Sequence, residues 1–242
     1  MCFIRPLHFG WRKMRDRTER GLSAVLTVAA VVIAVALVHR EFFPAAGARA
    51  SAAPQGPPVY LADWKDLLAG SVVLGDSNAT VQVIEFTDLE CPFCKRFNAV
   101  VRSVRAKYGR GVSLAVVHLP LEMHRFARPA ARAVECAGAE SRFESLFNLI
   151  YEKQDSLGLK SWGSFAAEAG VRDTAAFLRC AAVATPNPRI ERGVALANKV
   201  GATGTPTVFV NGWRYASPPD QAELDRVVSV LLSGKNPFEV AK

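Results

Sequence analysis

The chain has 242 residues, of which 50% are hydrophobic and 21% charged, so it is too apolar to be disordered and long enough to bury a core. Its 17 glycines and 14 prolines are too few for a collagen-like or low-complexity chain. The formal net charge is +8, and half of this excess lies in residues 1–20, which carry six basic and two acidic side chains. A basic tail beside a membrane explains that distribution better than a nucleic-acid-binding face, which would gather its charge on the folded domain. We therefore expect no nucleic-acid partner.

An apolar segment directly follows the basic tail of residues 1–21. Residues 22–38 carry no charged side chain and, as a helix, would be roughly 26 Å long at about 1.5 Å per residue, which just spans a bilayer core. The positive-inside rule then leaves the N-terminus in the cytoplasm and places everything after the segment outside it. We expect an uncleaved, single-pass anchor in the cell membrane. The alternatives are a signal peptide cleaved near Ala50, which would give a secreted or periplasmic protein, and a buried core helix.

Residues 39–58 connect this anchor to the folded part of the chain. From residue 44 they are almost entirely Ala, Gly, Pro and Ser, a composition that buries too little apolar surface to fold. We expect a flexible tether here and a single folded domain at residues 59–242.

Strand and helix patterns alternate within this domain. Apolar, β-branched runs predict strands at residues 81–87, 112–118, 207–210 and 213–215, the last two joined by an Asn-Gly turn. Helical spacing, with proline at the start or glycine at the end, predicts helices at 92–108, 189–200 and 221–232. Residues 126–183 are Ala-rich with helical spacing and contain no strand candidate. The order indicates an α/β sandwich interrupted by a block of helices.

The segment Cys91-Pro92-Phe93-Cys94 lies where the first strand meets the first helix. Cysteines three apart in a first helical turn share one face and are close enough for a disulfide. At the helix N-terminus, free N–H groups and the helix dipole favour a thiolate on Cys91, the species needed for thiol–disulfide exchange. Cys94, one turn further in, would be more buried and would resolve the mixed disulfide. This chemistry needs no cofactor.

Two other interpretations of the cysteine pair were weighed. A zinc site would need two further Cys or His at matching spacing, and Cys136 and Cys180 are 44 residues apart without such a pattern, so we expect no metal. A purely structural disulfide across so short a loop would constrain the unfolded chain little.

Three segments resemble the DsbA-like branch of the thioredoxin superfamily. Residues 83–97 (VIEFTDLECPFCKRF) resemble its active-site segment, and residues 204–212 (GTPTVFVNG) resemble its cis-proline segment and the hairpin that follows. Residues 118–121 and 124–137 resemble the start of its helical insertion. The resemblance covers roughly residues 71–232. It implies a thioredoxin fold with a helical insertion at about 121–188, and exported thiol–disulfide oxidoreductase activity.

The resemblance also implies roles for three further residues. Pro206 matches the cis-proline that faces the disulfide and lets a substrate strand pair alongside; the alternative is an ordinary trans turn proline. Thr205 would lie against Cys91 and tune its behaviour as a leaving group, unless it is only the first residue of a strand. Glu85 matches a buried carboxylate beneath the second cysteine that could take the proton of Cys94; otherwise it faces solvent at a sheet edge.

Four further residues within or near the motif also have expected roles. Phe93 would be an exposed apolar contact for unfolded substrates or, alternatively, a packed aromatic. Asp88 and Glu90 are expected to raise the pKa of Cys91, because their charges repel a thiolate. His124 is expected to be a solvated residue at the start of a helix rather than a catalytic base.

Cys136 and Cys180 both lie in the helical block. In an exported domain they indicate a second, structural disulfide, with two buried free thiols as the alternative.

The sequence thus favours a membrane-tethered, extracytoplasmic oxidoreductase that introduces disulfides into exported proteins with free thiols. A membrane reoxidase of the DsbB or VKOR type would restore the pair, and we expect a monomer. The alternatives are a reductase of the same fold supplied by a membrane electron donor, and a non-catalytic peptide-binding or chaperone module.

Overall fold

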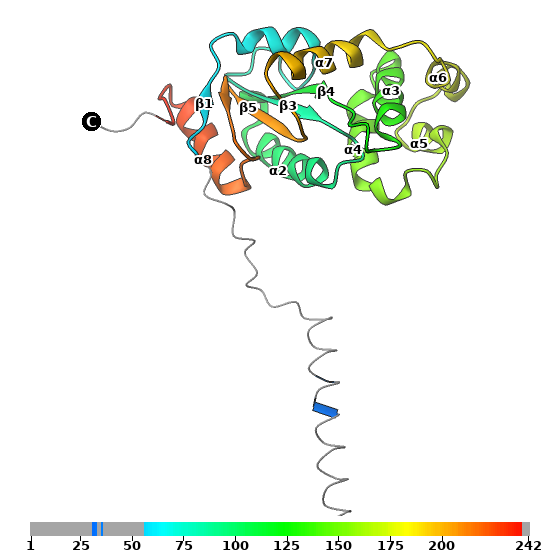
Figure 1. Cartoon of the computed structure of the whole chain (residues 1–242), viewed down its shortest axis with the longest axis horizontal. Helices are drawn as coiled ribbons and strands as arrows, with labels where there is room; N and C mark the ends of the chain where they lie inside the picture. Colours follow the sequence, from blue (N-terminus) through cyan, green and yellow to red (C-terminus); the bar gives the residue numbers. More distant parts are fainter. Residues whose placement is uncertain (1–30, 33–34, 36–55, 239–242) are drawn as a thin grey trace, which may run out of the picture. The chain divides into compact units, whose positions relative to one another are not determined.

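The computed structural model describes residues 31–32, 35 and 56–238 (Figure 1). The expected basic tail of residues 1–21 lies outside the described residues, as does most of the segment 22–38 and of the tether 39–58. Within the described ranges, no helix combines the length and apolar character that crossing a membrane would require.

A six-stranded sheet with the order β1-β6-β5-β3-β4-β2 forms the centre of the folded domain (Figure 1). Its strands are β1 (Val59–Tyr60), β2 (Val72–Leu74), β3 (Val81–Thr87), β4 (Val112–His118), β5 (Thr207–Val210) and β6 (Trp213–Arg214). β3 and β4 run parallel, and the other neighbouring strands run antiparallel. The expected strands are confirmed, except that β6 ends one residue early, and the short β1 and β2 were not foreseen.

Helices cover both faces of this sheet (Figure 1). They are α2 (Pro92–Tyr108), α7 (Pro188–Lys199) and α8 (Gln221–Leu232), with the 3-10 helix η1 (Trp64–Gly70). Side chains of β3 alternate between the faces, so Val81 and Val83 pack in the core beneath α2 and α8, whereas Ile84 and Phe86 pack in the core beneath α7 and η1. The same alternation places Glu85 on the α2 side.

The expected block of helices between β4 and β5 is present. Its members are α3 (Ala127–Ala137), α4 (Phe143–Glu152), α5 (Trp162–Glu168) and α6 (Thr174–Ala181), with the short turns η3 (Gly138–Glu140) and η4 (Gln154–Ser156). A further turn, η2 (Gly109–Gly111), joins α2 to β4. These helices pack on one another, and α4 also packs on α2. The insertion therefore reaches the helix that begins at the cysteine pair.

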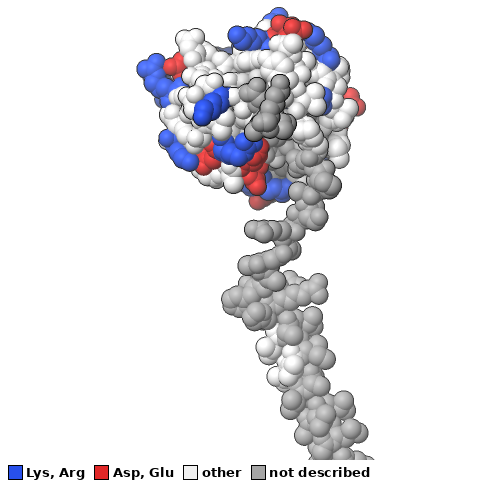
Figure 2. Space-filling model, turned by 90° about the vertical axis from the view of Figure 1, so that its left-hand side faces the viewer, with Lys and Arg blue, Asp and Glu red and all other residues white. Residues whose placement is uncertain are grey.

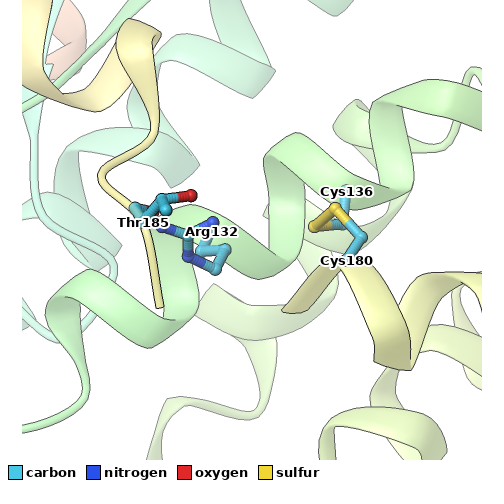
Figure 3. The surroundings of a disulfide bond; sticks show 4 residues. All are labelled: Arg132, Cys136, Cys180 and Thr185. Atoms are coloured by element: carbon cyan, nitrogen blue, oxygen red, sulfur yellow. Dashed lines mark hydrogen bonds between the residues drawn. A yellow bond between two sulfur atoms is a disulfide. The ribbon is translucent and has the colours of Figure 1, made fainter. Parts of the chain in front are cut away.

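Cys136 and Cys180 form a disulfide that joins the end of α3 to the end of α6 (Figure 3). Their Cα atoms are 5.8 Å apart, and the bond closes a separation of 44 residues. Arg132, one turn earlier on α3, donates a hydrogen bond to the carbonyl oxygen of Thr185 just after α6 (Figure 3). Both contacts hold the last helix of the insertion against its first.

Charges of both signs are interspersed on the face that carries β1 and α8 (Figure 2). On α8 itself, Arg226 pairs with Glu223, and Asp225 pairs with Lys107 of α2.

Candidate active site

The chain turns from β3 into α2 at the cysteine pair, as its sequence predicts. Cys91 is the N-cap of α2, Pro92 occupies the first helical turn, and Cys94 follows within that turn. The two side chains are 3% and 0% exposed, and their sulfur atoms are not bonded to each other. This arrangement is that of a dithiol in its reduced state.

The surroundings of Cys91 favour its thiolate. A hydrogen bond from the thiol of Cys94 is the largest cause that lowers the pKa of Cys91, to about 5; burial opposes it, and the Thr205 hydroxyl and the N–H groups of Cys94 and Phe93 add to it. In its protonated form the Cys91 thiol instead donates a hydrogen bond of 3.4 Å to the carbonyl oxygen of Thr205. A thiol with this pKa is ionised at neutral pH, which suits both attack and departure in disulfide exchange.

Cys94 has the opposite character. Burial raises the pKa of its thiol well above the ordinary value, and the hydrogen bond it gives to Cys91 and the charges of Glu85 and Cys91 raise it further. The pair is therefore asymmetric, with one thiolate at the helix terminus and one protonated thiol in the core. A protonated, buried Cys94 needs a neighbouring base before it can act as a nucleophile.

Glu85 lies in the core beside this thiol. Its side chain is fully buried, because β3 is a central strand between β4 and β5. Burial raises the pKa of Glu85 to about 8; the hydrogen bond from Thr87 opposes this rise, and the charge of Cys91 adds to it. The alternative of a solvent-facing position at a sheet edge is wrong. A carboxyl group with this pKa can exchange a proton near neutral pH.

The segment before β5 faces Cys91. The peptide bond between Thr205 and Pro206 is cis, so the alternative of a trans proline does not hold. The carbonyl oxygen of Thr205 contacts the Cys91 sulfur, and its buried hydroxyl oxygen has no partner at ordinary hydrogen-bond distance among the described residues. Residues 114 positions apart in the chain thus meet at one sulfur atom.

Phe93 points outward from the motif. Its side chain is 58% exposed, and the guanidinium of Arg96 lies 4.4 Å from its ring centroid. The alternative of a packed aromatic is therefore wrong. The ring is apolar surface that is open to solvent within the motif.

The expectation that Asp88 would repel the thiolate needs correction. The Asp88 carboxylate is buried and accepts hydrogen bonds from the N–H groups of Glu90 and Leu121 and from the imidazole of His124, each at 2.8 Å. Glu90 accepts from the N–H of Phe126 at the start of α3. Both carboxylates thus join the loop before Cys91 to the start of the insertion, and the pKa of Cys91 is nevertheless low.

His124 is a partner of Asp88 and not a solvated residue. Burial disfavours its charged form, but the hydrogen bond and charge of Asp88, together with the charges of Cys91 and Glu90, outweigh burial and raise the pKa of His124. The raised pKa favours the charged form of this imidazole next to the negative charge that the sequence places beside the motif.

Three polar residues at this site were not foreseen, and two of them come from the insertion. Gln154 donates to the carbonyl oxygens of Leu89 and Cys91, at 2.9 and 3.1 Å. Tyr151 contacts Thr87, which in turn contacts Glu85. The only sequence signal for Thr87 was its even spacing from Glu85 on the strand, and nothing local marked the other two.

The reduced chain is expected to gain stability relative to the oxidised chain as the pH rises from 5 towards 8.5. Because folding lowers the pKa of Cys91, its stabilisation is present above the unfolded pKa and is lost as the pH falls through about 5. At pH 7 it amounts to roughly 1–3 kcal/mol, the lower figure allowing for solvent screening. Urea unfolding of both redox forms at pH 5 and pH 8 measures the difference. Glu85 has a raised pKa, so its contribution to stability falls with rising pH in both redox forms. The prediction is contradicted if the unfolding free energies of the two forms change by the same amount between pH 5 and pH 8.

Across the described part of the chain, no group of three His, Cys, Asp or Glu side chains is placed to hold a metal ion.

A family model described as thioredoxin matches residues 68–229. Among curated proteins, the Na(+)/H(+) antiporter NhaA 1 of Mycolicibacterium gilvum is 33% identical over 159 residues, which cover 64% of this chain and 26% of the antiporter. The antiporter NhaA of Herminiimonas arsenicoxydans is 29% identical over 168 residues, 69% of this chain and 27% of that protein. The chain thus spans about a quarter of the length of the curated relatives it matches.

Three solved structures of similar fold come from bacteria. Oxidised BdbD from Bacillus subtilis superposes with a TM-score of 0.61 at 24% identity, over 74% of this chain and 98% of that one. The catalytic domain of Proteus mirabilis ScsC superposes with a TM-score of 0.59 at 23% identity, over 72% of this chain and 97% of that one. Wolbachia pipientis alpha-DsbA1 superposes with a TM-score of 0.58 at 22% identity, over 68% of this chain and 92% of that one. At these identities the likeness establishes the fold.

Proposed function

Because this chain belongs to the thioredoxin family, we propose that it is a thiol–disulfide oxidoreductase that introduces disulfides into exported proteins through Cys91 and Cys94. The observation that carries the proposal is the asymmetry of the pair. The pKa of Cys91 is lowered to about 5 by its hydrogen bonds, with that from Cys94 foremost, while burial raises the pKa of Cys94. A merely structural pair would have no need of this difference.

In the proposed reaction a substrate thiolate attacks the Cys91 sulfur of the Cys91–Cys94 disulfide. The bond between the two cysteines breaks, and Cys94 leaves with the electron pair and takes up a proton, which Glu85 is placed to supply. The second substrate thiolate then attacks the substrate sulfur bound to Cys91. A substrate disulfide forms, and Cys91 leaves as a thiolate, so that the protein gains the two electrons that the substrate loses.

The stability of that thiolate supports the oxidative direction. A leaving thiol of low pKa departs faster, and a stabilised reduced form makes the disulfide a stronger oxidant. Phe93 and the cis-proline segment at Thr205 and Pro206 are proposed to hold the substrate, the first through its exposed ring and the second by strand pairing beside the sulfur.

We further propose that the domain works outside the cytoplasm, held at the cell membrane by residues 22–38. The disulfide between Cys136 and Cys180 supports an oxidising compartment. Relatives named as Na(+)/H(+) antiporters, which are membrane proteins, carry a region similar to this domain and support a site close to a membrane. The partners would be proteins with free thiols and a membrane reoxidase of the DsbB or VKOR type. The chain itself would be a monomer.

The reduction potential of the pair tests the oxidative direction. Equilibrated against glutathione, the purified chain is expected to give a value closer to about −120 mV than to about −270 mV, because its reduced form is stabilised. A value near about −270 mV would overturn the oxidase assignment and favour the reductase of the same fold.

A further inference from the structure

A chain of buried hydroxyl groups leads from Glu85 into the helical insertion. The Thr87 hydroxyl is 2.7 Å from Oε1 of Glu85 and 2.6 Å from the hydroxyl of Tyr151 on α4. The Tyr151 hydroxyl lies in turn 3.3 Å from the carbonyl oxygen of Asp88. The side chains of Glu85, Thr87 and Tyr151 are 0%, 1% and 3% exposed. The proposed base of the reaction is thus connected to an element that lies more than sixty residues further along the chain.

The hydrogen bonds along this row of hydroxyl groups can be arranged in two ways. Each hydroxyl has one proton to donate and can accept at its oxygen. With Glu85 ionised, Thr87 donates to Glu85, and Tyr151 donates to Thr87. With the proton on Oε1 of Glu85, that carboxyl donates to Thr87, Thr87 donates to Tyr151, and Tyr151 donates to the Asp88 carbonyl. Every buried O–H group has an acceptor in both arrangements, so neither protonation state of Glu85 leaves a donor unsatisfied.

The rest of the surroundings of Glu85 offers little else to stabilise its charge. Its partners across the sheet are Val116 of β4 and Val208 of β5, which are apolar. The core on its face of the sheet is built from apolar side chains of α2 and α8. The titratable groups that influence it or its hydroxyl chain are Cys91 and Cys94 from α2 and Asp88 from the loop, with Tyr151 from α4. All of these acquire negative charge when they ionise, and the charge of Cys91 raises the pKa of Glu85, whereas a hydrogen bond from the protonated Cys94 thiol lowers it.

The second carboxyl oxygen of Glu85 is available for the reacting thiol. Oε2 is buried and has no hydrogen-bond partner within residues 56–238. The Cys94 thiol is close enough to influence the pKa of Glu85. One oxygen of the carboxyl group is therefore held by the hydroxyl chain, while Oε2 is not held by it.

We propose that Thr87 and Tyr151 are positioning residues that form a two-hydroxyl relay, which donates a hydrogen bond to Oε1 of the Glu85 carboxylate and so stabilises the base that takes the proton of Cys94 at Oε2. This inference rests on the proposed function, and it gives the helical insertion a part in the chemistry of the pair. The step is a proton transfer from the Cys94 thiol to the Glu85 carboxylate. The Cys94 thiolate then attacks the Cys91 sulfur of a mixed disulfide, the new S–S bond forms, and the bound thiolate leaves with the electron pair.

The rate of this ring closure tests the relay. The reduced full chain is mixed with oxidised glutathione, and release of the second glutathione from Cys91 is followed by stopped flow between pH 5 and pH 9. In Thr87→Val, the ionised Glu85 loses its hydrogen bond, so ring closure at pH 7 is expected to slow by about tenfold and its inflection to move up by about one pH unit. Tyr151→Phe, which keeps the ring, is expected to slow the step by about threefold through loss of cooperative hydrogen bonding. Thr87→Ser, which keeps the hydroxyl, should restore the wild-type rate.

Tyr215→Phe is the matched control. Tyr215 is also a buried tyrosine, 7% exposed, and its hydroxyl has no hydrogen-bond partner in the described structure. Its variant should therefore follow the wild-type pH profile. A ¹³C NMR titration of the Glu85 carboxyl in the same variants gives a readout that does not depend on exchange, and the inflection should rise in Thr87→Val and remain in Tyr215→Phe.

The outcomes separate the relay from the function on which it rests. If Tyr151→Phe and Thr87→Val match Tyr215→Phe in both measurements while the wild type exchanges disulfides, the relay is overturned and the oxidoreductase stands. A wild-type chain that forms no mixed disulfide with glutathione would overturn the proposed function, and the relay with it.

Discussion

Replacing Cys91 with serine is expected to slow disulfide exchange by about 10³-fold or more. With a pKa of about 5, set chiefly by the hydrogen bond from Cys94, Cys91 is roughly 99% thiolate at pH 7, whereas a serine hydroxyl stays protonated and cannot form the mixed disulfide. The measurement is the rate at which the oxidised or reduced chain exchanges with a peptide dithiol or disulfide at pH 7.

Cys94→Ser is the internal control for this loss. The variant keeps the Cys91 thiolate and should still attack a disulfide, but the reaction should stop at the mixed disulfide, which accumulates on a non-reducing gel. Should Cys91→Ser bind client proteins as the wild type does and leave the cellular phenotype unchanged, the non-catalytic binding module would replace the oxidoreductase as the favoured function.

Removing the second disulfide is expected to cost about 3–4 kcal/mol of unfolding free energy. In the chain-entropy description, a closed loop of 44 residues limits the unfolded chain by this amount. Cys136→Ala combined with Cys180→Ala, unfolded in urea beside the wild type, measures the loss. Because α3 packs on both α4 and α6, we expect the insertion to loosen as a unit and the contacts of Tyr151 at the active site to weaken with it.

Arg132→Gln provides the comparison at the same pair of helices. It removes the hydrogen bond to the carbonyl of Thr185 while leaving the disulfide in place, and should cost less than about 1 kcal/mol. If the double cysteine variant lost no more unfolding free energy than Arg132→Gln, the disulfide would not be the contact that holds α6 against α3.

Most of the central elements were predictable because their signals are local. Pro92 at the start of α2 and Gly109 after its end mark the helix bounds, and the apolar, β-branched runs of β3 and β4 mark two buried strands. β1 and β2 were not predicted because strands of two and three residues are too short to show a periodic pattern. They are strands only because β6 and β4 supply their hydrogen-bond partners, which lie far away in the sequence.

The prediction for the charges near the motif failed for a related reason. Asp88 and Glu90 are sequence neighbours of Cys91, and from sequence alone their charges act on its thiolate. In the folded chain both carboxylates accept hydrogen bonds from the start of the insertion, and the imidazole of His124 is one of the partners of Asp88. A carboxylate's effect on a neighbouring pKa depends on its other partners, and those partners lie more than thirty residues away.

The sequence by itself determined the reactive pair and where it lies. Cys91 and Cys94 at a strand-to-helix junction define a thiolate at a helix N-terminus, and that conclusion needs only helix geometry and the dipole of the first turn. Only the tertiary structure decided which groups surround Cys94, through which we propose that the pair exchanges its proton. The groups around Cys94 come from β3, the loop after it and α4, and burial, hydrogen bonding and charge act over a few ångströms in space, regardless of how far apart these residues are in the chain.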